Sequence, residues 1–312
     1  QPVTYLLRQA VSLSNIAGAV SMQFKVKENT TLMEFLAKSI AGKSRTGIKA
    51  LLAKRLVFVD HKVETQFNLP LTPGQTITVG KKTAAEPVML RGVRIVYDDD
   101  DLVVIDKEAG LLSVAADTGS EKSAHSITGA HLKRLNHKAR LFIVHRLDRE
   151  TSGLMMFVKH KELQRQLRDN WQESILLRSY AVVVEGIVAQ DKGKIVSWLK
   201  GTDGLRTYSS PVEGDGQKAI SHFKVVRRGA ANTLLEVELE TGRKNQIRVH
   251  MQDLGHPVIG DDKYGAATNP IRRLGLHAQI LKFNHPVSGQ NMAFESETPK
   301  DFLRLFNPRS NQ

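Results

Sequence analysis

The sequence contains no cysteine among its 312 residues. A chain without thiols can form neither a disulfide framework nor a zinc site with cysteine ligands. The composition is compatible with a reducing compartment, and we expect a cytoplasmic protein.

Long hydrophobic runs are also absent. The longest nearly apolar stretch near the start, Ala10 to Val20, contains two serines and an asparagine. It is far shorter than the roughly 20 residues of a membrane span, and no basic leader precedes it. We therefore expect no association with a membrane.

Acidic residues are fewer than basic ones. The chain has 32 Asp and Glu residues against 45 Lys and Arg residues, which gives a net charge of +13 at pH 7. This charge favours a polyanionic partner, and nucleic acid fits better than a membrane because no long basic amphipathic helix stands out. Hydrophobic residues make up 41% of the chain, which is enough for a substantial core.

The chain is too long for one small module, so we expect a large domain and a smaller one. Residues 22–82 are predicted to form the smaller unit, residues 83–87 a polar linker, and residues 88–308 the larger domain. We interpret residues 1–21 as an appendage, because Met22 is a candidate natural start.

The smaller unit is predicted to be a small basic α/β domain. Its apolar residues recur at helical spacing in two segments, and two short β-prone runs follow at residues 56–59 and 76–79. Basic residues gather on the second helix and its approaches, at Lys43, Arg45, Lys49, Lys54 and Arg55. This face suits the binding of phosphates, although a solvated helix face is the simpler explanation for the lysines taken alone.

The larger domain is richer in strand patterns than in helix patterns. Strand-like runs occupy residues 93–97, 102–105, 154–158, 180–184, 223–226 and 234–239. Helical patterns occupy residues 124–135, 161–171 and 245–254. Because strands and helices do not alternate regularly, we expect an α+β fold with a mixed, mostly antiparallel central sheet and flanking helices.

The stretch from His145 to Gly153 combines basic, acidic and hydroxyl side chains just before an apolar run. An aspartate on a polar turn before a buried strand is exposed by the turn and fixed by the strand, so Asp148 is the candidate reactive carboxylate. For one aspartate alone, a surface turn in which Asp148 pairs with Arg146 or Arg149 would be the simpler interpretation.

Three further segments carry candidate residues. Tyr180 begins a strand-like run, where a tyrosine is ordinarily a core residue with its hydroxyl satisfied. Arg243 and Arg248 lie before or at the start of an expected helix, which is a common arrangement for anion binding. Lys107 follows the strand-like run at residues 102–105.

Together these segments resemble the motifs of RluA-type RNA pseudouridine synthases. His145 to Gly153 is similar to HRLD-x-x-TSG, residues 176–186 to K/R-x-Y-x-A-x-V-x-G, and residues 241–250 to GR-T/S-HQ-I/L-RVH. The resemblance extends over roughly residues 93–304, with its motifs in family order. It implies the pseudouridine synthase fold with neither cofactor nor metal, since the isomerisation of uridine involves no redox change.

The resemblance also implies roles for three catalytic candidates. Asp148 is the catalytic aspartate, which either attacks the anomeric carbon of uridine or removes a sugar proton to form a glycal. Tyr180 lies against the flipped base and can serve in proton transfer. Arg248 pairs with Asp148, and we expect a bidentate guanidinium that keeps this carboxyl ionised.

A second group of residues is expected to contact RNA. Arg146 resembles the arginine that fills the space of the flipped base, with a phosphate contact as the alternative. His145 is grouped with it, as a neutral imidazole that supports the loop through a backbone hydrogen bond. Lys107 and Arg243 complete the group. The match departs at residues 244–245, where lysine and asparagine replace the usual Thr or Ser and His.

The smaller unit resembles the S-four-type RNA-binding domain over residues 32–79. This resemblance implies a helix face that follows phosphates, so we expect binding to depend steeply on salt. The expected partner is structured RNA bound by a monomer, with large-subunit ribosomal RNA as the first choice of substrate and transfer RNA as the second.

Two other functional classes are less well supported. A metal-dependent nuclease would cluster His and Asp residues, whereas the histidines here are scattered, and the acidic run at residues 98–101 suits a hairpin turn better than a metal site. A non-catalytic RNA-binding protein would not need Asp148, Tyr180 and Arg248 together.

Overall fold

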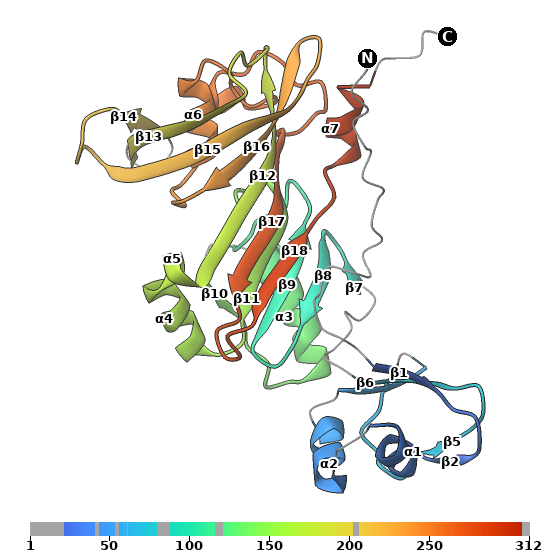
Figure 1. Cartoon of the computed structure of the whole chain (residues 1–312). Helices are drawn as coiled ribbons and strands as arrows, with labels where there is room; N and C mark the ends of the chain where they lie inside the picture. The colour runs from blue at the N-terminus through green and yellow to red at the C-terminus, as the bar shows by residue number, and fades with distance from the viewer. Residues whose placement is uncertain are drawn as a thin grey trace. The chain divides into compact units, whose positions relative to one another are not determined.

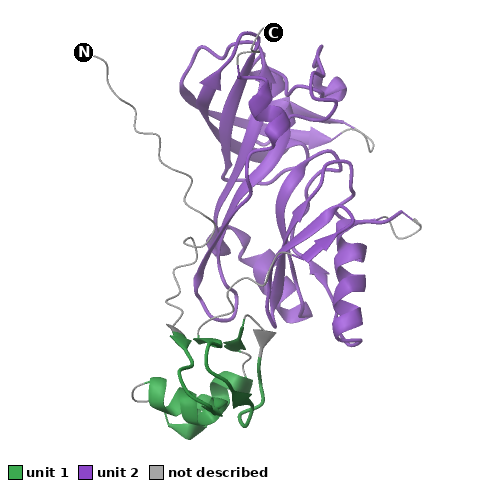
Figure 2. Ribbon diagram, turned by 90° about the vertical axis from the view of Figure 1, so that its right-hand side faces the viewer, with its two compact units in different colours: residues 1–86 green, residues 87–312 purple. Residues whose placement is uncertain are grey.

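The computed structural model divides the chain into two compact units, residues 1–86 and 87–312, which are coloured separately in Figure 2; Figure 1 labels their helices and strands. The structure describes residues 22–40, 44–53, 56–60, 62–79, 88–115, 121–201 and 206–307. Several predictions concern residues outside these ranges, namely residues 1–21, the linker at 83–87, and Lys43, Lys54 and Arg55.

The first unit packs two helices against short antiparallel strands. The strands are β1 (Met22–Lys25), β2 (Thr30–Thr31), β3 (Val57–Val59), β4 (Lys62–Val63), β5 (Pro70–Leu71) and β6 (Thr76–Val79), and the helices are α1 (Leu32–Ser39) and α2 (Arg45–Ala53). Strands β1, β6, β3 and β4 form one sheet in that order, and β2 pairs with β5. Helix α1 begins at a capping box between Thr31 and Glu34. Leu36, Ile48 and Ile77 meet in the core, so the apolar spacing of both helices faces the sheet.

The second unit is built on one sheet of twelve strands. The strands are β7 (Val88–Leu90), β8 (Val93–Asp98), β9 (Leu102–Lys107), β10 (Phe142–Ile143), β11 (Ser152–Val158), β12 (Ile175–Glu185), β13 (Lys192–Gly201), β14 (Thr207–Ser210), β15 (Gln217–Arg228), β16 (Asn232–Leu239), β17 (Leu276–Asn284) and β18 (Asn291–Glu295). The helices are α3 (Ala124–Leu135), α4 (Lys161–Asp169), α5 (Trp171–Ser174), α6 (Gln246–Asp253) and α7 (Lys300–Arg304), with a 3-10 turn η1 (Asp262–Tyr264).

The strand order places distant parts of the chain side by side. It runs β14-β13-β15-β16-β12-β17-β11-β9-β8-β7, with β10 on β11 and β18 on β17. Strands β11 and β17 pair in parallel over only two residue pairs, whereas the other pairings of the described strands are antiparallel. The predicted α+β fold with a mostly antiparallel sheet and flanking helices is therefore confirmed.

Helices cover the buried faces of this sheet, as Figure 1 shows. Met155 and Phe157 of β11 face α3, and the alternate residues Leu154 and Met156 face α4. Helix α6 packs Ile247 and other apolar residues on β12, β15 and β16. Because β11 is buried on both faces, the loop that precedes it has a rigid base. No helix in the described part of the chain is long and apolar enough to cross a membrane.

Candidate active site

The loop between β10 and β11 carries Asp148, and buried groups fix its backbone. The Ser113 hydroxyl donates to the carbonyl of Leu147 at 2.6 Å and accepts from the N–H of the same residue at 3.1 Å. The N–H of Thr151 donates to the carbonyl of Asp148 at 3.2 Å. These contacts hold the backbone on both sides of Asp148, whose side chain stays 28% exposed and available to a ligand.

Lys107 supports the same loop from inside the protein. The residue is only 1% exposed, and its ammonium donates to the carbonyls of Glu108, Leu111 and Arg149 at 3.0, 2.7 and 3.0 Å. Burial lowers the pKa of Lys107 to about 8. The prediction that Lys107 contacts RNA is therefore wrong, because its charge is enclosed and its three N–H donors bond to backbone.

Ser152 and Gly153 join the loop to β17. Ser152 Oγ accepts from Arg273 Nη2 at 2.6 Å and lies 2.8 Å from His277 Nδ1. Burial lowers the pKa of His277 to about 4, so its neutral ring can accept the serine proton at Nδ1. Gly153 has a φ of +114°, and an added Cβ would overlap the backbone of Ala278. The serine and glycine of the motif thus fix β11 against β17.

Arg248 faces Asp148 from helix α6. Its Nη1 lies 3.5 Å from Asp148 Oδ2, whereas its Nε and Nη2 donate to the two carboxylate oxygens of Asp261 at 2.6 and 2.7 Å. Burial alone would lower the pKa of Arg248, but Asp261 outweighs burial and raises it. The predicted bidentate contact to Asp148 is therefore wrong. Nε and Nη2 both bond to the buried carboxylate of Asp261, and only Nη1 faces Asp148.

Asn245 completes the support of Arg248 at the start of α6. Its backbone is left-handed, with a φ of +56°, which asparagine tolerates better than most residues. The amide oxygen accepts from Arg248 Nη1 at 3.2 Å, and the amide nitrogen donates to the Tyr264 hydroxyl at 3.0 Å. The buried Tyr264 ring lies 4.9 Å from the guanidinium carbon. Asn245, one of the two residues at which this sequence differs from the family motif, therefore bonds directly to Arg248.

Tyr180 reaches the site from β12. It pairs with Ala278 of β17 on one side and with Val237 of β16 on the other, so the sheet fixes its backbone. Burial raises the pKa of Tyr180, while Arg178 opposes and Asp148 adds to this shift. The phenol is neutral and can stack or donate a proton.

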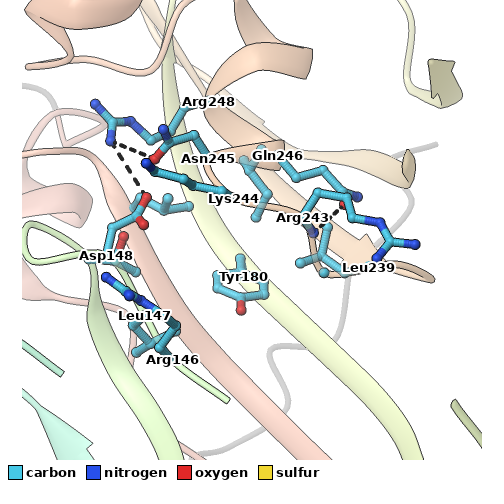
Figure 3. Close-up of a pocket in the computed structure, with 14 residues that line it drawn as sticks. Arg146, Leu147, Asp148, Tyr180, Leu239, Arg243, Lys244, Asn245, Gln246 and Arg248 are labelled. Atoms are coloured by element: carbon cyan, nitrogen blue, oxygen red, sulfur yellow. Dashed lines mark hydrogen bonds and ion pairs between the residues drawn. The ribbon is translucent and has the colours of Figure 1, made fainter. Parts of the chain in front are cut away.

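A cavity of about 310 Å³ brings these groups together. Its lining comprises Arg146, Leu147, Asp148, Thr151, Tyr180, Leu239, Gly242, Arg243, Lys244, Asn245, Gln246, Ile247, Arg248 and Leu276. Figure 3 shows Asp148, Tyr180 and Arg248 around this cavity, with dashed lines from Arg248 to Asp148 and Asn245. A carboxylate, a neutral phenol and a guanidinium can together bind a polar ring and move protons on it.

The predicted RNA-binding residues of this unit divide into two groups. Arg146 and Arg243 are exposed and line the cavity. His145 does not line it: its Nε2 accepts from the backbone N–H of Met156 at 2.9 Å, and its ring centroid lies 5.3 Å from that of Trp171. Burial lowers the pKa of His145 to about 3, so the imidazole is neutral. This contact is the backbone support expected from the sequence.

In the first unit, two predicted RNA-binding residues are described. Arg45 and Lys49 are both exposed on α2. The Lys49 ammonium lies 5.2 Å from the ring centroid of Phe67, which leaves its charge available at the surface.

The acidic run at residues 98–101 forms the turn between β8 and β9. The N–H of Asp99 donates to the carbonyl of Leu102 at 3.1 Å. Although Asp101 and His285 lie close to Asp99, the Asp99 carboxylate already accepts from Tyr97, His285 and two backbone N–H groups. These bonds occupy the oxygens that a cation would need.

Comparison with known proteins identifies the family of this chain. Residues 101–253 match the RNA pseudouridylate synthase family. A Bacillus subtilis protein named as the uncharacterized RNA pseudouridine synthase YlyB is 34% identical over 282 residues, which cover 87% of this chain and 91% of that protein. The chain belongs to the RNA pseudouridine synthase family. It is therefore an enzyme that isomerises uridine in RNA, as predicted.

Two further pseudouridine synthases extend the comparison. Ribosomal large subunit pseudouridine synthase D of Neisseria meningitidis serogroup A is 35% identical over 286 residues, which cover 86% of this chain and 76% of that protein. The solved structure of human RNA pseudouridylate synthase domain containing 4 aligns with a TM-score of 0.54 at 22% identity, over 67% of this chain and 90% of that chain. The structural likeness shows that the fold is shared. The S-four-type likeness of the first unit stays a prediction.

Proposed function

We propose that this pseudouridine synthase isomerises a specific uridine in large-subunit ribosomal RNA and that Asp148 is its catalytic aspartate. The convergence of Asp148, Tyr180 and Arg248 on one cavity carries the proposal. The Asp148 side chain is partly exposed at the cavity and its backbone is fixed from behind, which suits a carboxylate that attacks the anomeric carbon or removes a sugar proton.

The flanking residues have complementary proposed roles. Arg248, held by Asp261, stabilises the charge of Asp148 without displacing it. Tyr180 lies against the inserted uracil and provides a neutral phenol for proton transfer. Arg146 fills the space that the flipped base vacates in the RNA, since its exposed guanidinium stands at the edge of the cavity.

The choice of ribosomal RNA is supported by the relatives and by charge. The Neisseria relative is named a ribosomal large subunit pseudouridine synthase, and the net charge of +13 suits a large structured RNA. The first unit, with Arg45 and Lys49 exposed on α2, serves as an S-four-type RNA-binding domain in this proposal. Changing both residues to alanine is expected to weaken RNA binding and to flatten its salt dependence.

Tritium release from transcripts labelled at carbon 5 of uridine tests the proposal. Wild type is expected to release tritium from a large-subunit ribosomal RNA transcript, and Asp148→Asn to release it at least about 10³-fold more slowly. Binding of the RNA by Asp148→Asn should stay within about threefold of wild type, because the substitution removes chemistry and not contact area.

A matched control and two outcomes complete the test. Asp191 is an exposed acid paired with Arg228 at 2.7 Å, and Asp191→Asn should leave the rate unchanged. Release from transfer RNA alone would move the substrate assignment to that class. Equal rates for Asp148→Asn and wild type would remove Asp148 from the catalytic role.

A further inference from the structure

Arg178 is a half-buried arginine on β12 that lacks an acidic partner among the described residues. Its Nη2 donates to the carbonyls of Leu239 and Glu240 at 3.4 Å each, which is long for a hydrogen bond. Its buried Nε has no hydrogen-bond partner. The guanidinium is therefore positioned by the fold but not neutralised by it.

Two neighbours flank this guanidinium, and one of them belongs to the cavity lining. The Trp171 ring centroid lies 5.8 Å from its central carbon, and an added Cβ at Gly242 would collide with its Nη1. Gly242 is itself part of the cavity lining. Because Gly242 has no side chain, Nη1 of Arg178 can lie directly behind the cavity wall.

Arg243 adds a second positive charge at the same place. It lines the cavity and is exposed. Burial lowers the pKa of Arg178, and the nearby charge of Arg243 lowers it further. Glu240, whose backbone carbonyl Arg178 contacts, directs its carboxylate to Lys194 and His222 instead. By contrast, Arg228 bonds two backbone carbonyls in a similar way but also pairs with Asp191.

We propose that Arg178 and Arg243 form a phosphodiester-binding site at the edge of the cavity, which holds a backbone phosphate next to the inserted uridine. Arg243 Nε donates to the carbonyl of Lys218 at 3.1 Å, but neither arginine has an acidic partner among the described residues. An anion can supply that partner, and RNA carries phosphates on both sides of every base. Arg178 lies two residues before Tyr180 on the same strand, so the bound phosphate belongs to the nucleotides that flank the target. This site rests on the proposed function, because it assumes that the uridine enters this cavity.

The salt dependence of RNA binding tests the site. We compare wild type with Arg178→Gln on an RNA that wild type converts, over a series of KCl concentrations. Loss of one phosphate contact is expected to weaken binding about tenfold at low salt and to reduce the slope of log affinity against log salt by about 0.7. Arg228→Gln is the matched control, because it removes an arginine that bonds backbone carbonyls in the same sheet; its slope should equal that of wild type.

Two further variants separate a lost contact from a misfolded chain. Arg178→Lys keeps the charge, so the slope should stay while affinity falls a few-fold through loss of the fork geometry. Gly242→Ala keeps both arginines but displaces Nη1 of Arg178, so it should weaken binding in a chain that retains its wild-type melting temperature. A wild-type slope in a folded Arg178→Gln protein, or wild-type affinity in Gly242→Ala, would overturn the site.

RNAs with neutral methylphosphonate linkages identify the phosphate. Neutralising one linkage beside the target should weaken wild type about as much as Arg178→Gln does, and the two changes combined should not add. If the two losses add at every linkage, Arg178 binds free phosphate or another anion and the assignment to RNA is wrong. Failure of the proposed function would appear separately, as RNA binding by wild type without tritium release.

Discussion

The two walls of the cavity position their charged groups by different means. On the Asp148 side, Ser113 and Lys107 bond only to backbone, so the carboxylate is placed by the shape of its loop. On the Arg248 side, the side chains of Asp261 and Asn245 bond the guanidinium itself. We therefore expect a substitution that disturbs the Asp148 loop to cause a large loss of activity in one step. Substitutions on the Arg248 side should cause losses that depend on which contacts to the guanidinium they remove.

The largest effect is expected from Gly153→Ala on the Asp148 side. The new methyl group would meet the backbone of Ala278, which has no room to move in the sheet. We expect the free energy of unfolding to fall by about 3 kcal/mol and activity to fall more than about 10²-fold. Thermal unfolding and tritium release measure the two quantities.

Gly214→Ala is the control for this substitution. Gly214 also has a positive φ, of +81°, but no atom lies within 4 Å of an added Cβ. It should therefore lose only about 1 kcal/mol from backbone strain. Equal losses in the two variants would show that the contact between β11 and β17 does not hold the first wall.

The next effect concerns Asp261→Asn on the Arg248 side. The substitution keeps the shape of the side chain but removes the charge that holds the fork, so Arg248 is free to leave Asp148. We expect kcat to fall about 10²-fold with a smaller change in KM. Asp106→Asn is the control, since Asp106 pairs with Arg94 at 2.8 Å outside this cavity. A loss of kcat in both variants would indicate general destabilisation.

The next prediction concerns the protonation of Lys107, which supports the Asp148 loop, and its effect on stability and activity. Its pKa is about 8 in the folded protein against the ordinary 10.5 of a lysine side chain, so the unfolded chain binds more protons between these values. The free energy of unfolding should rise with pH across this window. Activity should instead fall, by up to about tenfold per pH unit above 8, because a neutral amine has two N–H donors for three carbonyls.

Lys107→Met isolates these opposite trends. The variant lacks the titrating group, so the difference between its unfolding free energy and that of wild type should show the rise directly, and its pH–rate profile should lack the falling limb. A wild-type protein whose stability relative to this variant decreases from pH 8 to about 10 would contradict the burial of a charged ammonium.

The smallest effect is expected from Asn245. Asn245→Ala removes one of several contacts to Arg248, so kcat should fall about threefold to tenfold. Asn245→Gly relieves the strain of the positive φ but also lacks the amide, and Asn245→His restores a polar side chain of the usual family type. If the glycine variant recovers kcat, the backbone and not the amide is what Arg248 needs.

Much of the fold could be predicted from local patterns. Helix α3 occupies the predicted residues 124–135, and the run at 154–158 became β11. Strands β13 and β14 were not predicted. Lysine and glycine interrupt the alternation of β13 where one face meets solvent, and β14 is only four mostly polar residues long. Strand β17 was also missed, because the burial of its residues is set by neighbouring strands from far along the chain.

The candidate site shows the same division. The motif residues Asp148, Tyr180 and Arg248 could be located from the sequence, because each lies in a distinctive segment. The bidentate partner Asp261 lies in a Gly-Asp pair after the helix, and the local sequence does not show that its carboxylate faces Arg248. Lys107 was assigned to RNA because a sequence does not show whether a charge is enclosed. Burial and pairing follow from tertiary packing, which no local pattern contains.

The strand order also decides when the site can exist during synthesis. Strand β17 lies between β12 and β11, so residues 276–284 join the strand that carries Tyr180 to the strand that follows the Asp148 loop. A ribosome makes those residues last among the site's components, after Arg248 has already emerged. Asp148, Tyr180 and Arg248 are therefore all synthesised before the strand that lies between their supporting strands.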